Sequence, residues 1–464
     1  MNVYLRIKFT LFLSLLVIGA FEASTSIASP GQLQTLTSFT GTNGANPYNT
    51  LWPGTDGSFY GVTFRGGSFG FPFGYGTVFK FTAPNTLLTL NSFDGTNGSK
   101  PIGGLIQVAD GNLYGTTTEG GSSGLGTVFR VSTNGNLAAL ISFTGNNGAS
   151  PAGRLTAGPD GFLYGTTQLG GASNSGTIFR IGTNGTFTSL AQFSETNGAN
   201  PYGELALGWD GNFYGTTVNG GMWDLGSIFR VATNGALTTL LVFDGTNGAN
   251  PYGGLVRGEA GDFYGTTAYG GNSGAGTIFR ITTNGTLTTL HSFTGGVDGA
   301  NPWASLVFGS DGFLYGTTIL GGRPTVAGSW GTVFQITTNG NFSSLHTFSF
   351  DVNGVSPYGS VAFDDQGFLY GMTFSQGAVL RGTIFSLRPA HPSLIPGKNI
   401  PGFFQLSWDT WLGQMYQPQY ATNLVQAHWT DWGTALLATT NRISISDPVS
   451  DQPMRFYRVN LVTP

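Results

Sequence analysis

The sequence predicts an all-β protein, in which a seven-bladed β-propeller closed by its own N-terminal strand precedes a small C-terminal β-sandwich. Three short motifs each recur seven times, at intervals of about 50 residues. They are a tyrosine in a Phe/Leu-Tyr-Gly-x-Thr run, a phenylalanine that ends a Gly-Thr/Ser-Val/Ile-Phe run and a phenylalanine that ends a Leu-x-x-Phe run. Such a period, with four strand-like runs per copy, is typical of propeller blades.

The three motifs keep one order along the chain. The tyrosines are Tyr60, Tyr114, Tyr164, Tyr214, Tyr264, Tyr315 and Tyr370. The phenylalanines of the second motif are Phe79, Phe129, Phe179, Phe229, Phe279, Phe334 and Phe385. Those of the third motif are Phe39, Phe93, Phe143, Phe193, Phe243, Phe293 and Phe348. The third motif therefore comes first in the chain and is missing after the last copy of the second.

A single copy predicts four antiparallel strands. In the copy that starts at Pro251, these strands cover residues 254–257, 262–267, 276–281 and 287–293. An Asp-Gly pair separates the first two strands in most copies, and an Asn-Gly pair separates the last two in most copies. Both pairs favour tight hairpins because their residues tolerate positive φ. Large apolar residues on both faces of these strands predict that each blade packs between two neighbours.

The offset between the motifs predicts how the ring closes. Residues 33–39 form a fourth strand that no first three strands precede, and the last copy ends after its third strand at residues 385–387. We therefore expect the N-terminal strand to complete the seventh blade, which leaves no long exposed sheet edge.

Composition excludes several classes of partner and of stabilising bond. The formal net charge is −4, which gives no basic surface for nucleic acid or for anionic lipid. The chain has no cysteine and hence no disulfide. Its 76 glycines are mostly turn residues, since aromatic residues at 14% indicate a substantial core.

The N-terminal segment predicts export. Arg6 and Lys8 precede the apolar stretch 9–20, and Ser26-Ile27-Ala28 offers a small-x-small cleavage site. A retained membrane anchor is the alternative, but the stretch is shorter than the roughly 20 residues that a spanning helix needs. We expect a signal peptide at 1–28, a propeller at 29–388, a proline-rich linker at 389–402 and a sandwich of immunoglobulin or fibronectin III character at 403–464. The mature protein would be extracellular, on the cell surface or in the periplasm.

The repeat resembles a known family. The Leu-Tyr-Gly-Thr-Thr-x-x-Gly-Gly and Gly-Thr-Val/Ile-Phe-Arg-Ile-x-Thr-Asn-Gly runs are similar to the GloVer tandem repeat of secreted bacterial proteins, over residues 33–388. The order of strands and turns resembles that of NHL propellers. The resemblance implies export and a surface location, and it implies no catalytic residues. The segment 403–464 is similar to C-terminal modules of secreted bacterial proteins, without the apolar tail or Leu-Pro-x-Thr-Gly motif of a wall or membrane anchor.

The sequence gives little evidence for a metal site or for acid–base catalysis by histidine. Recurrent hairpin aspartates suggest calcium only as an alternative to a role in turns, because the Asp-x-Asp-x-Asp-Gly spacing of a calcium loop is missing. The four histidines, His291, His346, His391 and His428, lie in outer strands, the linker and the small domain. A lyase that uses histidine as acid or base therefore lacks its parts. We expect no metal and no cofactor.

Departures from the repeat identify candidate binding residues. Three positions after the proline that opens each copy, two copies carry a charge, Arg154 and Glu204; they form either an ion pair between blades or a polar contact in a ligand site. One position after that proline, five copies carry a ring. These rings are Tyr48, Tyr202, Tyr252, Trp303 and Tyr358. We expect the five rings to surround the mouth of the central channel on one face.

Three irregular loops open on the same face. The loop between the second and third strands is four residues longer in the first copy, with Phe71, Phe73 and Tyr75, and in the sixth, from Arg323 to Trp330. The seventh copy adds Arg381. Ring closure would make these copies neighbours, so the loops form one sector. One interpretation is that these loops bind a ligand. The alternative is that Phe69, Phe71 and Phe73 pack the first loop onto the propeller.

These residues predict an exported, non-catalytic binding or scaffold propeller. Its ligand would be a glycan or an extracellular protein, and the protein would be a monomer. One alternative is an extracellular hydrolase or lyase that uses Glu204 and Arg154 at the channel mouth. A second alternative is a purely structural surface repeat protein.

Overall fold

The computed structural model describes eleven stretches of the chain. They are 33–70, 72–323, 330–350, 353–365, 367–387, 394–400, 403–409, 415–422, 429–437, 442–448 and 455–462. Contacts divide the chain into a large unit, Gln34–Ser386, and a second unit that contains Leu387–Pro464. The predicted signal peptide, 1–28, lies outside the described residues.

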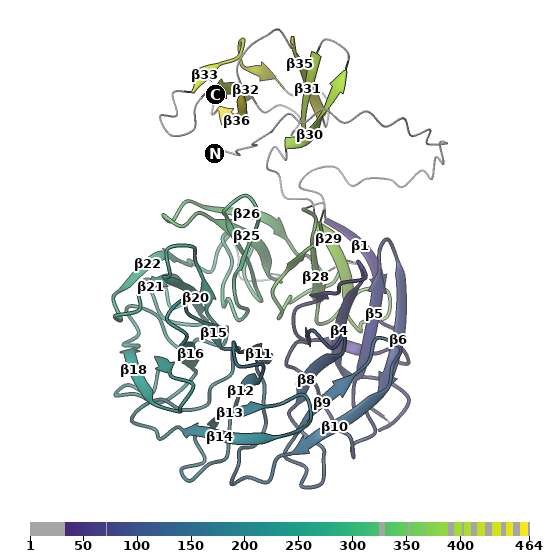
Figure 1. Ribbon diagram of the computed structural model, residues 1–464, viewed down its shortest axis with the longest axis vertical. Coiled ribbons are helices and arrows are strands. Elements are labelled where there is room, and N and C mark those ends of the chain that lie inside the picture. Colours follow the sequence, from purple (N-terminus) through teal and green to yellow (C-terminus); the bar gives the residue numbers. More distant parts are fainter. Residues whose placement is uncertain are drawn as a thin grey trace. The chain divides into compact units, whose positions relative to one another are not determined.

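The described part of the large unit contains seven antiparallel sheets, six with four strands and one with five (Figure 1). Sheet 1 has β2 (Ala45–Pro47), β3 (Trp52–Pro53), β4 (Phe59–Arg65), β5 (Thr77–Thr82) and β6 (Thr86–Ser92). Sheet 2 has β7 (Ile106–Gln107), β8 (Leu113–Thr117), β9 (Thr127–Val131) and β10 (Leu137–Ser142). Sheet 3 has β11 (Thr156–Ala157), β12 (Leu163–Thr167), β13 (Thr177–Ile181) and β14 (Phe187–Gln192).

The remaining four sheets repeat the same order. Sheet 4 has β15 (Ala206–Leu207), β16 (Phe213–Thr217), β17 (Ser227–Val231) and β18 (Leu237–Val242). Sheet 5 has β19 (Val256–Arg257), β20 (Phe263–Thr267), β21 (Thr277–Ile281) and β22 (Leu287–Ser292). Sheet 6 has β23 (Val307–Phe308), β24 (Leu314–Thr318), β25 (Thr332–Ile336) and β26 (Phe342–Thr347). Sheet 7 has β27 (Ala362–Phe363), β28 (Leu369–Thr373), β29 (Thr383–Leu387) and β1 (Leu33–Ser38).

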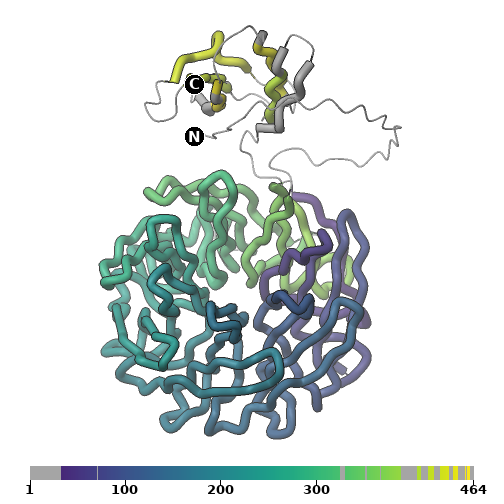
Figure 2. The backbone as a smooth tube through the Cα atoms, in the orientation of Figure 1, coloured from purple at the N-terminus to yellow at the C-terminus, as the bar shows by residue number. Residues whose placement is uncertain are grey.

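The sheets follow one another around a common centre in a propeller-like arrangement, as the sequence colours of Figure 2 show. The first strands β11 and β15 lie near the centre, and the fourth strands β10, β14 and β18 lie at the rim (Figure 1). The predicted all-β class, with sheets of four antiparallel strands, is confirmed. First strands are shorter than predicted: β19 has two residues, where residues 254–257 were expected.

A close contact between neighbouring strands explains why the first two motifs always occur together. In sheet 4 the glycine of Tyr-Gly, Gly215, pairs with Phe229 of the third strand. A Cβ atom on Gly215 would lie 2.6 Å from Cζ of that phenylalanine. The phenylalanine ring therefore covers the glycine backbone, and a side chain at the glycine would displace it. The same contact recurs at Gly61, Gly115, Gly165, Gly265, Gly316 and Gly371.

Buried hydroxyls join the second and third strands at their other end. In sheet 2 the Oγ1 atoms of Thr117 and Thr127 lie 2.8 Å apart, and both side chains are fully buried. Gly98, with φ of +128°, lies against this pair, where a Cβ would be 2.6 Å from Cγ2 of Thr117. The corresponding hydroxyl pairs are Thr63–Thr77, Thr167–Thr177, Thr217–Ser227, Thr267–Thr277, Thr318–Thr332 and Thr373–Thr383. The threonine of the first motif is thus a structural residue.

The recurrent hairpin aspartates accept hydrogen bonds from the recurrent tyrosines. The hydroxyl of Tyr114 donates to Oδ2 of Asp110 at 2.6 Å, and that of Tyr214 donates to Oδ2 of Asp210 at 2.8 Å. The pairs Tyr60–Asp56, Tyr164–Asp160 and Tyr315–Asp311 do the same. The described residues contain no group of three or more potential metal ligands. The tyrosine hydroxyls thus give these carboxylates a role in the turn.

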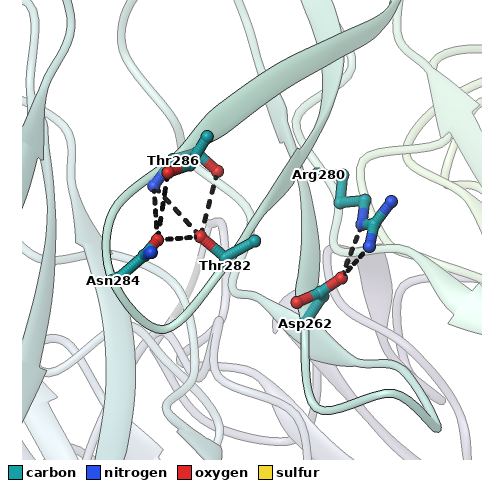
Figure 3. A network of polar contacts seen from close by, with 5 residues as sticks. All are labelled: Asp262, Arg280, Thr282, Asn284 and Thr286. Carbon is teal, nitrogen blue, oxygen red and sulfur yellow. Dashed lines mark hydrogen bonds and ion pairs between the residues drawn. The ribbon is translucent and has the colours of Figure 1, made fainter.

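Sheet 5 replaces this contact with another. Its first hairpin carries Ala260 where the first four copies and the sixth have aspartate, and Asp262 instead forms an ion pair with Arg280, whose Nε donates to Oδ2 at 2.6 Å (Figure 3). The turn between β21 and β22 is held by polar groups of its own. Asn284 Oδ1 accepts from the amide of Thr286 at 3.2 Å and from its Oγ1 at 3.0 Å (Figure 3).

The small unit is also all β in the residues that are described. One sheet has the order β30 (Leu394–Ile400), β31 (Phe403–Asp409), β35 (Arg442–Pro448). In the other, β32 (Met415–Ala421) pairs with β33 (Thr430–Asp431), β34 (Leu436–Leu437) and β36 (Phe456–Val462). Buried Leu406, Trp408, Tyr416, Tyr457 and Val459 form its core.

Part of the predicted linker is a strand. Residues 394–400, within the predicted linker 389–402, form β30 and pair with β31. The register of this pairing shifts between Ile395 and Lys398, on either side of Pro396, and proline within a strand is typical of bulges. Prolines were the basis for the linker prediction, and a proline at a bulge gives the same sequence signal. Among the described residues there is no helix long and apolar enough to cross a membrane.

We predict that Gly215→Ala destabilises the protein by about 1–3 kcal/mol, because the new methyl group would overlap the ring of Phe229. The unfolding free energy from urea titration measures the change. Gly182→Ala is the matched control, since the equivalent position of the next repeat carries Ala232, and it should cost less than about 0.5 kcal/mol. Equal losses in both variants would contradict the role assigned to the glycine–phenylalanine contact.

Stability should fall at both ends of the pH scale. Burial opposes ionisation of Asp110, but hydrogen bonds from Tyr114 and Asn112 outweigh it and lower its pKa. A carboxyl with a lowered folded pKa stabilises the fold above its unfolded pKa, so this contribution disappears as pH falls below about 4. Burial and the bond to Asp110 raise the pKa of Tyr114 to about 12, so its contribution disappears as pH rises from about 10 towards that value.

Urea midpoints measured across this pH range test both limits. Asp110→Asn should weaken the dependence at acid pH, and Tyr114→Phe should weaken the dependence at alkaline pH. A variant with the pH profile of the wild type would contradict the corresponding assignment.

Candidate functional site

A local motif aims one residue of each repeat at the centre of the large unit. In sheet 4 the residue before the opening proline, Asn200, has φ of +55°, and its Nδ2 donates to the carbonyl of Gln168 at 3.0 Å. The following Pro201 packs on Gly176, where a Cβ would lie 2.7 Å from its Cδ. Because both residues are held by the preceding sheet, the next residue, Tyr202, has a fixed direction. The same arrangement holds for Asn250–Pro251 and Asn301–Pro302.

The five predicted rings meet one another at the centre. Tyr252 and Trp303 stack with ring centres 4.1 Å apart and planes 3° apart, and Tyr48 and Tyr358 stack at 4.9 Å. Edge contacts join Trp303 to Tyr358 at 5.5 Å and Tyr202 to Tyr252 at 5.4 Å. The side chains of Tyr48 and Tyr202 hydrogen-bond to each other. The rings were expected to surround an open mouth, but they form a closed group that fills it.

Little space remains between the rings. They line a cavity of about 30 Å³ together with Glu204 and Ser360, which is enough for one or two water molecules. Two buried polar atoms in this lining, Nε1 of Trp303 and Oγ of Ser360, have no hydrogen-bond partner among the described residues. Water in the cavity would satisfy both atoms. A sugar ring does not fit there without displacement of the aromatic side chains.

The two central hydroxyls are neutral at physiological pH. Burial raises the pKa of Tyr48 to about 12, and the hydrogen bond with Tyr202 partly opposes this shift. Burial also raises the pKa of Tyr202 well above its ordinary value, and the neighbouring Tyr48 adds to the effect. Neither tyrosine therefore serves as a base near neutral pH.

Arg154 and Glu204 form an ion pair between sheets 3 and 4, with Nη2 and Oε1 3.6 Å apart. The guanidinium of Arg154 lies 5.1 Å from the ring centre of Trp52. The side chain of Glu204 packs on Gly254, where a Cβ would lie 3.0 Å from its Cδ. The structure thus brings the two predicted residues together, and Glu204 alone of the two lines the central cavity.

The central rings continue outwards into a group that we call the aromatic sector: Tyr48, Phe64, Phe73, Tyr358 and Phe374. Phe374 contacts Tyr358 and Tyr48, with ring centres 5.0 and 5.9 Å apart, and Phe64 lies 6.2 Å from Tyr48. The guanidinium of Arg65 lies 5.4 Å from the ring of Phe64 and 5.2 Å from that of Phe73. Sheets 7 and 1 therefore contribute a continuous aromatic surface.

Sequence reasoning missed Phe64 and Phe374, although a signal was present. The other five repeats carry smaller or polar side chains at this position, directly after the second strand. They are Thr118, Gln168, Val218, Ala268 and Ile319. The two aromatic residues belong to the neighbouring first and last copies, which meet only when the chain ends pair.

The loop residues have different surroundings. Phe69 and Phe73 are 52% and 61% exposed, so the alternative that they pack the loop onto the body does not hold for them. Tyr75 instead lies against Gly70, where a Cβ would be 2.9 Å from its ring. Phe71 and residues 324–329 lie outside the described residues.

The other predicted loop residues lie in sheets 6 and 7. Trp330 contacts Phe350, with ring centres 5.3 Å apart. Arg323 is exposed. The guanidinium of Arg381 lies beside Gly41, and its carbonyl accepts from the amide of Asn46 at 2.8 Å. Arg381 therefore lies where the last copy meets the first.

Among the residues that the structure describes, no histidine lines the central cavity. His291 stacks on Phe342 at 4.1 Å, and its Nε2 lies 3.2 Å from Asp298. Burial lowers the pKa of His291, although Asp298 opposes this effect. His391 and His428 lie outside the described residues.

Comparison with known proteins identifies the repeat. The family model described as the Gloeobacter/Verrucomicrobia repeat matches residues 23–226 and 203–396. No curated protein matches the chain by sequence.

Several solved structures have a similar but distant chain path. A 6-phosphogluconolactonase candidate from Bacteroides fragilis is 16% identical, with 84% of this chain and 94% of that chain covered and a TM-score of 0.43. A gluconolactonase from Xanthomonas campestris is 14% identical, with coverage of 60% and 82% and a TM-score of 0.39. A puromycin-hydrolyzing peptidase from Mycobacterium tuberculosis is 11% identical, with coverage of 83% and 62% and a TM-score of 0.45. Similarity at this level says nothing about the activity of this chain.

The ion pair between sheets 3 and 4 should contribute little to stability. We predict a coupling energy below about 1 kcal/mol in a double-mutant cycle of Arg154→Met and Glu204→Gln, because both side chains are partly exposed. Urea unfolding of the wild type, the two single variants and the double variant gives this value. A coupling energy above about 2 kcal/mol would contradict the prediction and indicate a desolvated pair.

Proposed function

Because the chain belongs to the Gloeobacter/Verrucomicrobia repeat family, we propose that it is an exported, non-catalytic binding protein built on a closed seven-bladed β-propeller. Its aromatic sector binds a partner protein outside the cytoplasm. The small unit is an immunoglobulin- or fibronectin III-like module appended to the propeller. The exposed ring of Phe73 beside Arg65, next to central rings that leave little open space, is the observation that carries this proposal.

Pairing of the chain ends supports the closed ring. Strand β1, from the start of the repeats, lies beside β29, from their end, in one sheet. The amide of Phe39 donates to the carbonyl of Gly382 at 3.0 Å. Phe59 of sheet 1 and Tyr370 of sheet 7 share one core cluster, with ring centres 4.5 Å apart. Sheets 7 and 1 are thus packed as the other neighbours are.

The chemistry of the aromatic sector favours a protein over a glycan. Exposed aromatic side chains together with arginine are enriched among the residues that dominate binding energy at protein interfaces. Phe73 is 61% exposed and carries the guanidinium of Arg65 against its ring. Phe69, in the same loop, is 52% exposed, and contiguous exposed apolar surface supports an interaction site. The central cavity of about 30 Å³ offers no room for a sugar.

The cavity offers weak support for catalysis. Glu204 is the sole carboxylate among its lining residues, and this carboxylate is already paired with Arg154. General acid–base hydrolysis or elimination requires a second titratable group within reach of the same substrate. The hydrolase or lyase that uses Glu204 and Arg154 therefore remains the alternative, and the purely structural repeat protein is the second.

Binding to an exported partner tests the proposal. The mature chain is immobilised and exposed to proteins of the culture medium and cell surface of the producing organism, and a retained protein is then purified and its Kd measured. Phe73→Ala should weaken binding at least about tenfold, the effect of losing one well-packed interface aromatic. Trp209→Ala is the matched control, since Trp209 is 70% exposed in the hairpin between β15 and β16, at the opposite end of the strands.

Three results would overturn the proposal. They are equal affinity of Phe73→Ala and the wild type, binding of glycans alone at the aromatic sector, and substrate turnover that Glu204→Gln abolishes. Retention of residues 1–28 in the protein isolated from its host, measured by mass spectrometry, would overturn export.

A further inference from the structure

An open surface pocket lies away from the central rings, between the loops of sheets 3 and 4, and most of its polar side chains are exposed. It has a volume of about 520 Å³, which is within the usual range of small-molecule sites. Its lining comes from the β12–β13 loop, the β14–β15 loop and the β16–β17 loop, with Ser173, Asn174, Glu195, Asn219 and Asp224 as its main polar side chains. We call it the side pocket. None of its lining residues belongs to the aromatic sector or the central cavity.

Three of these side chains stand where other repeats have glycine. Glu195 occupies the position of Gly41, Gly95, Gly145 and Gly245. Asn174 and Asp224 occupy the position of Gly124 and Gly274, and their φ angles of +53° and +55° keep the left-handed backbone of those glycines. The polar lining is therefore specific to these two neighbouring repeats and is not a property of the repeat itself.

The side pocket presents both acceptors and donors that are not otherwise used. The carboxylate of Glu195 and the side-chain amide of Asn219 make no hydrogen bond or ion pair with described residues. Oδ1 of Asn174 accepts a hydrogen bond from the amide of Gly170 at 2.9 Å, so the NH₂ group of Asn174 is available to a ligand. Oδ1 of Asp224 accepts a hydrogen bond from the amide of Gly220 at 2.7 Å, so Oδ2 is available to a ligand. A ligand hydroxyl donates to a carboxylate and accepts from an amide, so polyhydroxylated molecules match this set.

The charge of the side pocket and the apolar side chains beside it restrict the class of ligand further. Two carboxylates and no lysine or arginine line the side pocket, which disfavours phosphorylated, sulfated or acidic sugars. Beside the lining residues Gly221 and Asp224, Met222 and Trp223 are 82% and 60% exposed. Other repeats carry a serine at the position of the tryptophan, such as Ser123 and Ser273. An exposed indole offers a flat apolar surface for the C–H face of a sugar ring, with its N–H free for a hydroxyl.

From these observations we infer that the side pocket is a binding site for an uncharged saccharide. The site does not depend on the proposed function of the aromatic sector. A protein that bears uncharged sugars would engage both surfaces, whereas a free oligosaccharide would engage the side pocket alone.

Titration calorimetry of the full chain tests this inference. The probes are uncharged di- and trisaccharides of glucose, galactose, mannose, xylose and N-acetylglucosamine. Trp223→Ser and Glu195→Gly restore the residues of the other repeats and are therefore compatible with the fold. Each should weaken binding of the best saccharide about tenfold or more, since each removes an aromatic contact or a charge-assisted hydrogen bond. Trp209→Ala, an exposed tryptophan at the other end of the strands, should bind as the wild type does.

Two kinds of result would overturn the inference. The first is no binding of any of these saccharides at millimolar concentration, or equal binding by Trp223→Ser, Glu195→Gly and the wild type. The second is selective binding of a lysine-rich peptide that Glu195→Gln abolishes, which would assign the side pocket to a cationic protein segment. Trp223→Ser should lose saccharide binding and keep binding of the partner protein. Phe73→Ala should lose binding of the partner protein and keep saccharide binding. This pair of results would separate the side pocket from the aromatic sector.

Discussion

The architecture depends on a phenylalanine ring that lies over a bare glycine backbone on the adjacent strand. Because Gly115 has no side chain, Phe129 of β9 reaches across β8 into the interface with the preceding sheet, where it packs with Tyr60. The tyrosine beside that glycine, Tyr114, faces the opposite way and packs with Phe179 of the next sheet. Each sheet thus shares one core with the preceding sheet and one with the next sheet, and a single repeat has no complete core of its own. The cluster that contains Phe59 of sheet 1 and Tyr370 of sheet 7 is the last of these shared cores.

The residue that follows the opening proline of each repeat can vary, because the contacts that fix its direction are made by its neighbours. Asparagine and proline fix the direction of the residue that follows them, through contacts with the preceding sheet. Lys100 and Ser150 stand in place of the asparagine in the two copies that carry Ile102 and Ala152 instead of a ring. They keep its positive φ, and the following proline keeps its contact with a glycine of the preceding sheet. Five rings at such positions interact mainly with one another. The repeat therefore separates residues that maintain the fold from residues that determine the surface.

Turn residues and motif spacing predicted most of the large unit. Strand positions in the second, third and fourth strands agreed with the structure to within one residue or so, because Asp-Gly and Asn-Gly pairs mark the hairpins. The convergence of the five rings followed from their common position, but contact between Trp303 and Tyr252 depends on the diameter of the ring, which periodicity does not give. Phe64 and the side pocket were missed because loops were compared by length, and the loop with Trp223 has the ordinary length. A comparison by residue type identifies both.

Residue type also distinguishes the loops of sheets 3 and 4 from those of the other sheets. A left-handed backbone costs little with glycine, whereas Asn174 and Asp224 adopt it at a small energetic cost that their own hydrogen bonds offset in part. Neither side chain enters a shared core, so packing does not require them. Trp223, 60% exposed in the same loop, buries little apolar area that would stabilise the fold. Side chains that contribute this little to stability and lie at one polar surface pocket are the physical basis of the saccharide site that we infer there.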